Sequence, residues 1–302
     1  MWIIRRRAFF YGLSAFLCAA SVYAFLALPV RYSVEFTGGT SVEVSYQDPK
    51  PTPEAIAASL VAAGAEDVLV RATGDHLSAR LAPLTPETHG PILAALNVAG
   101  FGASSIVSES TIGPSFGREL AGRMGWAFLL VSLAIALFVA FAFRAVSSPV
   151  PSWKYGVVTI VALAHDIVIT AGSFVALGLF LDAPIDALFV TALLVILGYS
   201  VNDTIVVFDR IRENLGKASE RERQERFDEI AGRSVREAAW RSVGTSTTTA
   251  IALLALAIFG GEVTRAFALA LVLGVVSGTY SSIFLAAPML VSWQRFVARR
   301  TK

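Results

Sequence analysis

Six long apolar stretches, separated by polar segments, dominate the pattern of hydrophobic and polar positions along this chain. They cover residues 8–28, 124–143, 155–180, 185–208, 245–259 and 263–291. A helix needs roughly 20 apolar residues to cross the hydrocarbon core of a bilayer. The pattern therefore predicts six transmembrane helices, of which 245–259 is the shortest.

The composition is typical of a membrane protein. Hydrophobic residues make up 55% of the sequence and charged residues 16%, and the mean hydropathy is +0.64, which is more apolar than a soluble domain. Arg5, Arg6 and Arg7 precede the first stretch as in a signal peptide, but its apolar run exceeds the usual length of roughly 7 to 15 residues. We expect a retained anchor, with a signal peptide as the alternative. The single cysteine, Cys18, lies there and is interpreted as an apolar filler.

The segment 31–123, between the first two predicted helices, is expected to lie outside the cytoplasm. If the N-terminus is inside, most of the 25 Lys and Arg residues fall in cytoplasmic segments, as the positive-inside rule requires. Both termini are then cytoplasmic. The outer segment has ten acidic and six basic residues, which argues against nucleic-acid binding. The predicted domains are 1–30, 31–123 and 124–302, with a cytoplasmic connector at 209–244.

The outer segment is long enough to fold as a small domain. Alternation of apolar and polar positions predicts strands at 33–36, 40–46, 67–72, 76–81 and 103–112. Thr52-Pro53 and Thr85-Pro86 each predict a helix start, with threonine as the N-cap and proline at the first helical position. The order ββαββαβ predicts an α+β ferredoxin-like sheet with an added N-terminal strand. Gly38-Gly39 is interpreted as the turn of the first hairpin.

Patterns typical of catalytic or cofactor sites are missing from the sequence. His76 and His89 lack the spacing of metal ligands, and there is no Cys/His cluster, nucleophile elbow or phosphate-binding loop. We therefore expect neither an enzyme, nor a cofactor, nor a bound metal.

Three further patterns concern packing and connections. Gly113-Pro114 and Gly117 predict that the link from the outer segment to the second span is kinked and not continuously helical. Alternating Glu and Arg residues in the connector predict a solvated helix along the membrane surface. Small residues recur at every fourth position of the last stretch and predict tight helix packing, within this chain or with a partner. They are Ala266, Ala270, Gly274, Gly278, Ser282 and Ala286.

Asn202 and Asp203 interrupt the fourth apolar stretch, and this pair raises the main functional question. Asp203 lies about 9 Å deeper than Asp209 along a helix, so it is submerged while Asp209 is interfacial. A carboxylate in hydrocarbon costs roughly 2.5 kcal/mol or more, so Asp203 must be neutralised, be paired or face water. It is interpreted either as a proton-binding group or as a structural hydrogen-bond acceptor, with Thr204 beside it.

Two other polar positions in the spans have open interpretations. His165 and Asp166, in the third span, either relay a proton or satisfy a polar group of a neighbouring helix. Arg241 stands at the start of a hydroxyl-rich entry to the fifth span. It either extends to the lipid headgroups or pairs with Asp203.

The chain resembles the SecF family of protein-export membrane proteins over nearly its whole length. The resemblance rests on VEFTGGT at 34–40, the His165-Asp166 pair, GYSVNDTIVVFDRIREN at 198–214, and six spans with one large outer domain after the first. It implies a polytopic α-helical bundle of the resistance-nodulation-division (RND) type in the bacterial cytoplasmic membrane. In that family, the acid of the Asn-Asp pair and an arginine at the start of the fifth span are implicated in proton conduction. By motif position these are Asp203 and Arg241.

The resemblance also implies partners and a function. The chain would work with SecD beside the SecYEG channel, and would use the proton-motive force to help draw preproteins across the membrane after the ATP-driven step. Contact with the preprotein would be indirect, because the larger preprotein-contacting domain is associated with SecD. Two rival functions stay open. One is a proton-coupled RND-type exporter of small molecules or lipids, which normally needs a second repeat that this sequence lacks; the other is a scaffold that titrates nothing.

Overall fold

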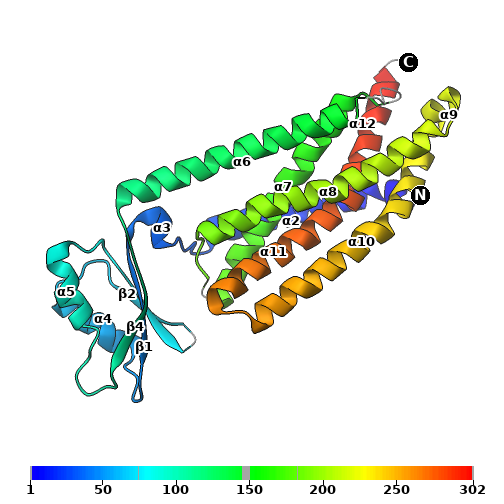
Figure 1. The fold of residues 1–302 in the computed structure, drawn as a ribbon. Coiled ribbons are helices and arrows are strands. Elements are labelled where there is room, and N and C mark those ends of the chain that lie inside the picture. Colours follow the sequence, from blue (N-terminus) through cyan, green and yellow to red (C-terminus); the bar gives the residue numbers. More distant parts are fainter. Residues whose placement is uncertain (1, 74, 145–149, 182, 301–302) are drawn as a thin grey trace. The chain divides into compact units, whose positions relative to one another are not determined.

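The computed structural model describes residues 2–73, 75–144, 150–181 and 183–300 (Figure 1). The chain divides into two compact units. The first unit takes in Met1–Val30, Ala127–Ala183 and Leu188–Lys302, and the second takes in Arg31–Trp126 and Pro184–Ala187.

The first unit is a bundle of long apolar helices. Its elements are α1 (Trp2–Arg5), α2 (Arg7–Ala27), most of α6 (Pro114–Ala142), α7 (Ser152–Leu181), α8 (Ala187–Gly216), α9 (Glu220–Glu225), α10 (Phe227–Phe259), α11 (Glu262–Ser281), the π-helical turn η1 (Ser282–Ala286) and α12 (Ala287–Arg300). Within the described residues, six helical segments are long and apolar enough to cross a membrane. The six predicted spans are thereby confirmed as helices, with η1 inside the sixth.

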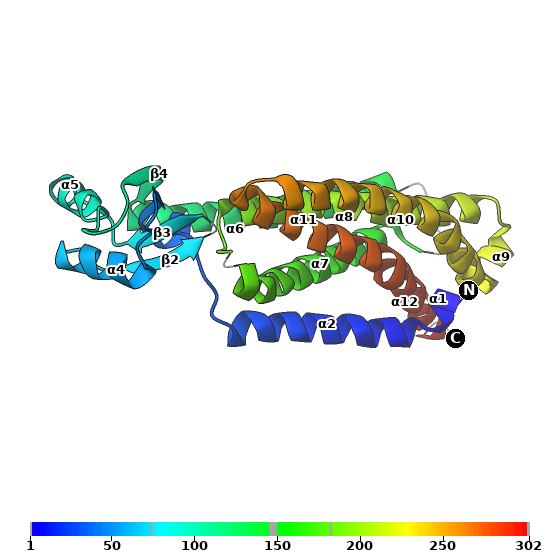
Figure 2. The same cartoon turned by 90° about the horizontal axis from the view of Figure 1, so that it is seen from below.

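Helices α7, α8 and α11 form the interior of this bundle. α7 packs against α2 on one side and α11 on another, and α11 packs against α10 (Figure 2). Large parts of α7 and α8 are buried, whereas α2 and α6 expose most of their apolar side chains. α8 runs on to Gly216 and α10 begins at Phe227, so most of the segment 209–244 extends these two helices.

The small-residue stripe runs along α11 and η1, and its two glycines serve packing inside the chain. A Cβ on Gly274 would lie 2.2 Å from the Ile196 side chain, and one on Gly278 would lie 3.0 Å from Cβ of Ser200. Ile196 and Ser200 are on α8. The two glycines therefore let α8 and α11 approach closely.

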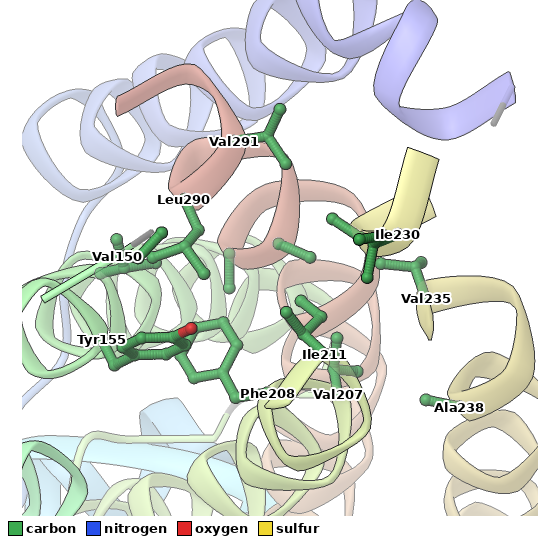
Figure 3. Close-up of a cluster of buried hydrophobic side chains, with 14 of the residues drawn as sticks. Val150, Tyr155, Val207, Phe208, Ile211, Ile230, Val235, Ala238, Leu290 and Val291 are labelled. Carbon is green, nitrogen blue, oxygen red and sulfur yellow. The ribbon is translucent and has the colours of Figure 1, made fainter. Parts of the chain in front are cut away.

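A buried hydrophobic cluster fills the bundle around the C-terminal half of α8 (Figure 3). Val207, Phe208 and Ile211 are completely buried in it. The Tyr155 ring packs edge-on against Phe208, with ring centroids 5.1 Å apart. The other residues labelled in Figure 3 are Ile230, Val235 and Ala238 of α10, Leu290 and Val291 of α12, and Val150, which lies just before α7.

The second unit contains a four-stranded antiparallel sheet. Its strands are β1 (Gly39–Tyr46), β2 (Leu69–Thr73), β3 (His76–Leu81) and β4 (Ser104–Ile112), in the order β2-β3-β1-β4. The helices α4 (Pro53–Ala62) and α5 (Pro86–Ala94) connect β1 to β2 and β3 to β4. Two interleaved βαβ units with this strand order are the ferredoxin-like arrangement.

One core stabilises this sheet. Val42, Val44 and Tyr46 alternate along β1 and pack with Ile56 and Leu60 of α4. The Tyr46 hydroxyl donates to the Leu96 carbonyl at 2.7 Å. Burial raises the pKa of Tyr46 to about 12, because the charged phenolate is disfavoured away from water.

Two predictions for this unit were wrong. The segment 33–36 is not a strand: the short helix α3 (Val34–Thr37) replaces it, so the order is βαββαβ and Gly38-Gly39 does not turn a hairpin. The Ser33 side chain is the N-cap of α3 and accepts a hydrogen bond from the Glu35 amide at 3.3 Å. Such a cap stabilises the first turn of a helix. The link after β4 is not kinked either, because α6 begins at Pro114 and continues through Gly117.

Candidate functional site

Asp203 lies on α8 between α10 and α11. Its side chain is buried, with 2% of the residue exposed. Ser246 of α10 and Thr279 of α11 donate hydrogen bonds to its Oδ2 at 3.2 and 3.3 Å. Both bonds are long for hydroxyl donors, which normally lie 2.7 to 2.8 Å away. The carboxyl group is therefore held loosely.

The hydroxyl groups beside Asp203 form a connected chain. Thr279 Oγ1 lies 2.5 Å from Ser246 Oγ, and its single proton can instead go to the Val275 carbonyl, 2.8 Å away. Tyr199, one helical turn before Asp203, can donate to Ser246 at 3.3 Å or to Thr249 at 3.2 Å. Each hydroxyl has one proton and several acceptors, so the direction of donation along the chain can change without moving a helix.

The other residues predicted near Asp203 are placed differently. Asn202 is exposed, and Thr204 is buried with no partner for its hydroxyl among the described residues. The Arg241 side chain is exposed and makes no ion pair with Asp203 in the described part of the chain. Residue 242, next to Arg241, is a buried serine on the same helix. The pair with Asp203, one of the two interpretations of Arg241, is not formed in this structure, and a conducting role for Arg241 stays a prediction.

Asp166, on α7, is the second buried carboxylate of the bundle and is 1% exposed. His165 Nδ1 and Ser277 Oγ donate to Oδ1, both at 2.9 Å. Ser200 and Ser281 donate to Oδ2 at 2.5 and 2.7 Å. The bond from His165 lies within α7, and the three serine bonds join α7 to α8 and α11.

The His165 ring is buried and lies 6.0 Å from the Tyr280 ring. Its Nε2 has no hydrogen-bond partner among the described residues. Within the part of the chain that the structure describes, no hydrogen bond continues from His165 toward Asp203. The relay interpretation therefore has less geometric support than the packing interpretation.

Most hydrogen-bond donors of both sites were not predicted from the sequence. Ser200, Ser277, Ser281 and Thr279 were not singled out, although Ser277 and Ser281 are one turn apart on α11 and share a face. This spacing of two serines in an apolar helix was the available signal. For metal binding, the described residues contain no group of three or more His, Cys, Asp or Glu side chains that could hold an ion.

Comparison with known proteins agrees with this architecture. The family model for the SecD/SecF protein export membrane protein, C-terminal part, matches residues 93–296, and the model for the SecD/SecF GG motif matches residues 23–50. The protein translocase subunit SecF of Thermobaculum terrenum is 39% identical over 97% of this chain and 93% of its own length. The SecF subunit of Anaerolinea thermophila is 33% identical over 97% of this chain and 94% of its own length.

A solved structure gives the same result. The crystal structure of the Thermus thermophilus SecDF, described as a translocon-associated membrane protein, matches 97% of this chain with a TM-score of 0.82 and 33% sequence identity. The match covers 38% of that longer chain. The chain belongs to the SecD/SecF family of protein-export membrane proteins.

Proposed function

We propose that this chain, a SecF-type translocase subunit, takes up and releases protons at Asp203 and thereby couples the proton-motive force to protein export. The observation that carries the proposal is the loose environment of a fully submerged carboxyl group. Asp203 is 2% exposed, accepts two long hydroxyl bonds on one oxygen and has no cationic partner among the described residues. A charge in such a place is costly, and proton binding removes it.

The surroundings of Asp203 differ on its two sides along the bundle. Tyr199 and Thr249 extend the hydroxyl chain toward the N-terminal half of α8. In the other direction Val207 and Ile211 are completely buried in the hydrophobic cluster of Figure 3. We infer from the positive-inside pattern that both termini are cytoplasmic; protons would then reach Asp203 along the hydroxyls from outside. Release inward would then require the apolar cluster to separate.

The energy available to such a site is substantial. One proton that moves down a membrane potential of 100 mV gains about 2.3 kcal/mol, and each unit of pH difference adds about 1.4 kcal/mol. Protonation also changes which hydroxyl bonds Asp203 accepts from α10 and α11. The two protonation states therefore favour different positions of α8 relative to these helices.

A SecD-type partner would complete the site. Asn202, Arg241, Thr245 and Thr248 are exposed polar residues on α8 and α10, near or within the spans. Polar side chains at membrane depth normally face protein or water and not lipid. The SecDF of Thermus thermophilus is a longer protein. It is 36% identical to this chain over a region that covers 97% of this chain and 40% of its own length. We infer that a SecD-type subunit covers this polar face and that Arg241 acts toward it.

The setting follows from the family and the spans. The chain is a multi-pass protein of the bacterial inner membrane. We infer that it works beside the SecYEG channel, and that it contacts the moving preprotein indirectly. An RND-type exporter of small molecules or lipids is a weaker alternative, because the similar proteins are named translocase subunits.

The decisive experiment is preprotein translocation into inverted membrane vesicles that contain the channel and a SecD-type partner, with and without a proton gradient. Asp203→Asn should assemble but lose the gradient-dependent stimulation, because its amide cannot exchange a proton at this site. Asp209→Asn is the matched control. Asp209 is on the same helix, has a 54% exposed side chain and pairs with Arg212 at 2.7 Å, so its variant should keep the stimulation. Full stimulation of Asp203→Asn would instead indicate a scaffold that titrates nothing.

A further inference from the structure

The segment that carries the GG motif is bonded to the start of α8. The Ile185 amide donates to the Arg31 carbonyl at 2.7 Å, and the Ser33 amide donates to the Ile185 carbonyl at 2.9 Å. These bonds form a short parallel bridge between Tyr32 and Ile185. Two residues later, the Ala187 amide donates to Oε2 of Glu35 at 2.6 Å. Ala187 is the first residue of α8.

The same segment is also fixed to the sheet. The guanidinium group of Arg80, on β3, donates to the Tyr32 carbonyl and to the Thr37 hydroxyl, each at 2.6 Å. Gly39 begins β1 with φ of +130°, and a Cβ there would lie 2.7 Å from the Leu81 carbonyl oxygen. Only glycine fits this combination of backbone angle and space without strain.

The start of α6 meets the segment as well. A Cβ on Gly117 would lie 2.8 Å from the Phe36 carbonyl oxygen, so the α6 backbone touches the α3 backbone there. All of these contacts lie within the second unit, which includes residues 184–187. Residues 31–39 therefore join three elements: the sheet, α6 and the first residue of α8. We name this segment the GG junction.

Glu35 is the one side chain of the GG junction in a described contact with an α8 amide. The first amides of a helix have no partner within the helix, and a negative charge there is favourable. Glu35 thus holds α8 by a bond that is short and charge-assisted. Asp203 lies about 24 Å further along the same continuous helix, at 1.5 Å per residue.

We propose that Glu35 is a positioning residue for proton-coupled export: with the Tyr32–Ile185 bridge, it keeps the outer sheet attached to α8 while α8 moves. The inference rests on the proposed function of Asp203. In this arrangement a shift of α8 on protonation is delivered directly to the outer domain. The bonds between the GG junction and residues 185–187 stay formed throughout the cycle, so the GG junction does not act as a gate.

The test replaces the lost bond by a covalent one. Glu35→Ala is measured alone and together with Tyr32→Cys and Ile185→Cys, in the full complex and in a Cys18→Ser background. Bridged residues of neighbouring strands are close enough for a disulfide. Glu35→Ala should reduce the gradient-dependent part of translocation at least about fivefold, the lower end of typical coupling effects. Oxidation of the cysteine pair should restore it, and reduction should remove it again.

A matched glutamate controls for a local capping effect. Glu54 lies in the first turn of α4, exposed, in the same outer domain, so Glu54→Ala should leave the stimulation unchanged. Asp203→Asn is run in parallel. If it loses stimulation while Glu35→Ala keeps it, this inference alone fails. If the oxidised cysteine pair abolishes the activity of a chain that retains Glu35, the bonds between the GG junction and residue 185 must break during the cycle. The proposal is then overturned.

Discussion

Two aspartates are buried to the same degree in one helical bundle, yet their surroundings differ sharply. Asp166 accepts four hydrogen bonds between 2.5 and 2.9 Å, from three serines and a histidine. Asp203 accepts two, at 3.2 and 3.3 Å, both on one oxygen. Burial alone therefore does not identify the group that exchanges protons. Under the proposed function, the number and length of the bonds distinguish the fixed carboxylate of Asp166 from the proton-exchanging carboxyl group of Asp203.

The two sites lie on opposite sides of the contact between α8 and α11. Ser277 and Ser281 point toward α7, whereas Thr279 is about 200° away from Ser277 around the helix axis and faces Asp203. Gly274 and Gly278 bring α8 and α11 together between them. One helix pair thus supports a tight anchor on one side and a loose hydroxyl chain on the other.

The largest expected effect on stability is at the anchor. Asp166→Ala would leave Ser200, Ser277 and Ser281 without their acceptor in an apolar interior, at about 1–3 kcal/mol for each unsatisfied group. We expect a total loss of about 3–5 kcal/mol, as for a broken buried network. Asp203→Ala, with weaker bonds to lose, should cost about 1–2 kcal/mol. Thermal unfolding of both variants in one detergent measures the difference, and equal losses would contradict the assignment of an anchor.

The helical bundle shows which features could be predicted from the sequence and which could not. Six spans follow from apolar length, and the structure has six helices long enough to cross a membrane, with Asp203 buried on one of them. The hydroxyl partners do not follow, because a Ser or Thr in a helix can bond its own backbone instead. Thr159 does so to Tyr155, at 2.8 Å. Only the contact between helices decides which hydroxyls reach a carboxylate.

The GG motif shows a second limit of the sequence. Four alternating residues before Gly38 predicted a strand, but Ser33 caps a short helix there and Glu35 bonds an amide 152 positions away. Gly38 ends the helix with φ of +74°. The glycines were visible as a backbone feature, whereas the contact with residues 185–187 depends on the folded chain.

Effects of intermediate size are expected at one serine beside each aspartate. Ser200→Ala removes the 2.5 Å bond to Asp166 and should cost about 1–2 kcal/mol, while Ser246→Ala removes a 3.2 Å bond to Asp203 and should cost less, about 0.5–1 kcal/mol. The order should reverse for function. Ser246→Ala interrupts the hydroxyl chain and should lower gradient-driven translocation per folded molecule, which Ser200→Ala should leave intact. The same order in both assays would mean that Asp166 takes part in proton transfer.

The smallest expected effect on stability is at Arg241, which is exposed and lies outside both hydrogen-bond networks in the described residues. Arg241→Met should change the free energy of unfolding of the isolated subunit by less than about 0.5 kcal/mol, as is usual for surface positions. In the complex with a SecD-type partner, the same variant should lose gradient-dependent stimulation, because the cation then faces a polar partner and not detergent. Arg241→Lys keeps the charge and is the control. If Arg241→Met retains full proton dependence in the complex, Arg241 serves only to reach the headgroups, and proton exchange at the loosely held carboxyl group proceeds without it.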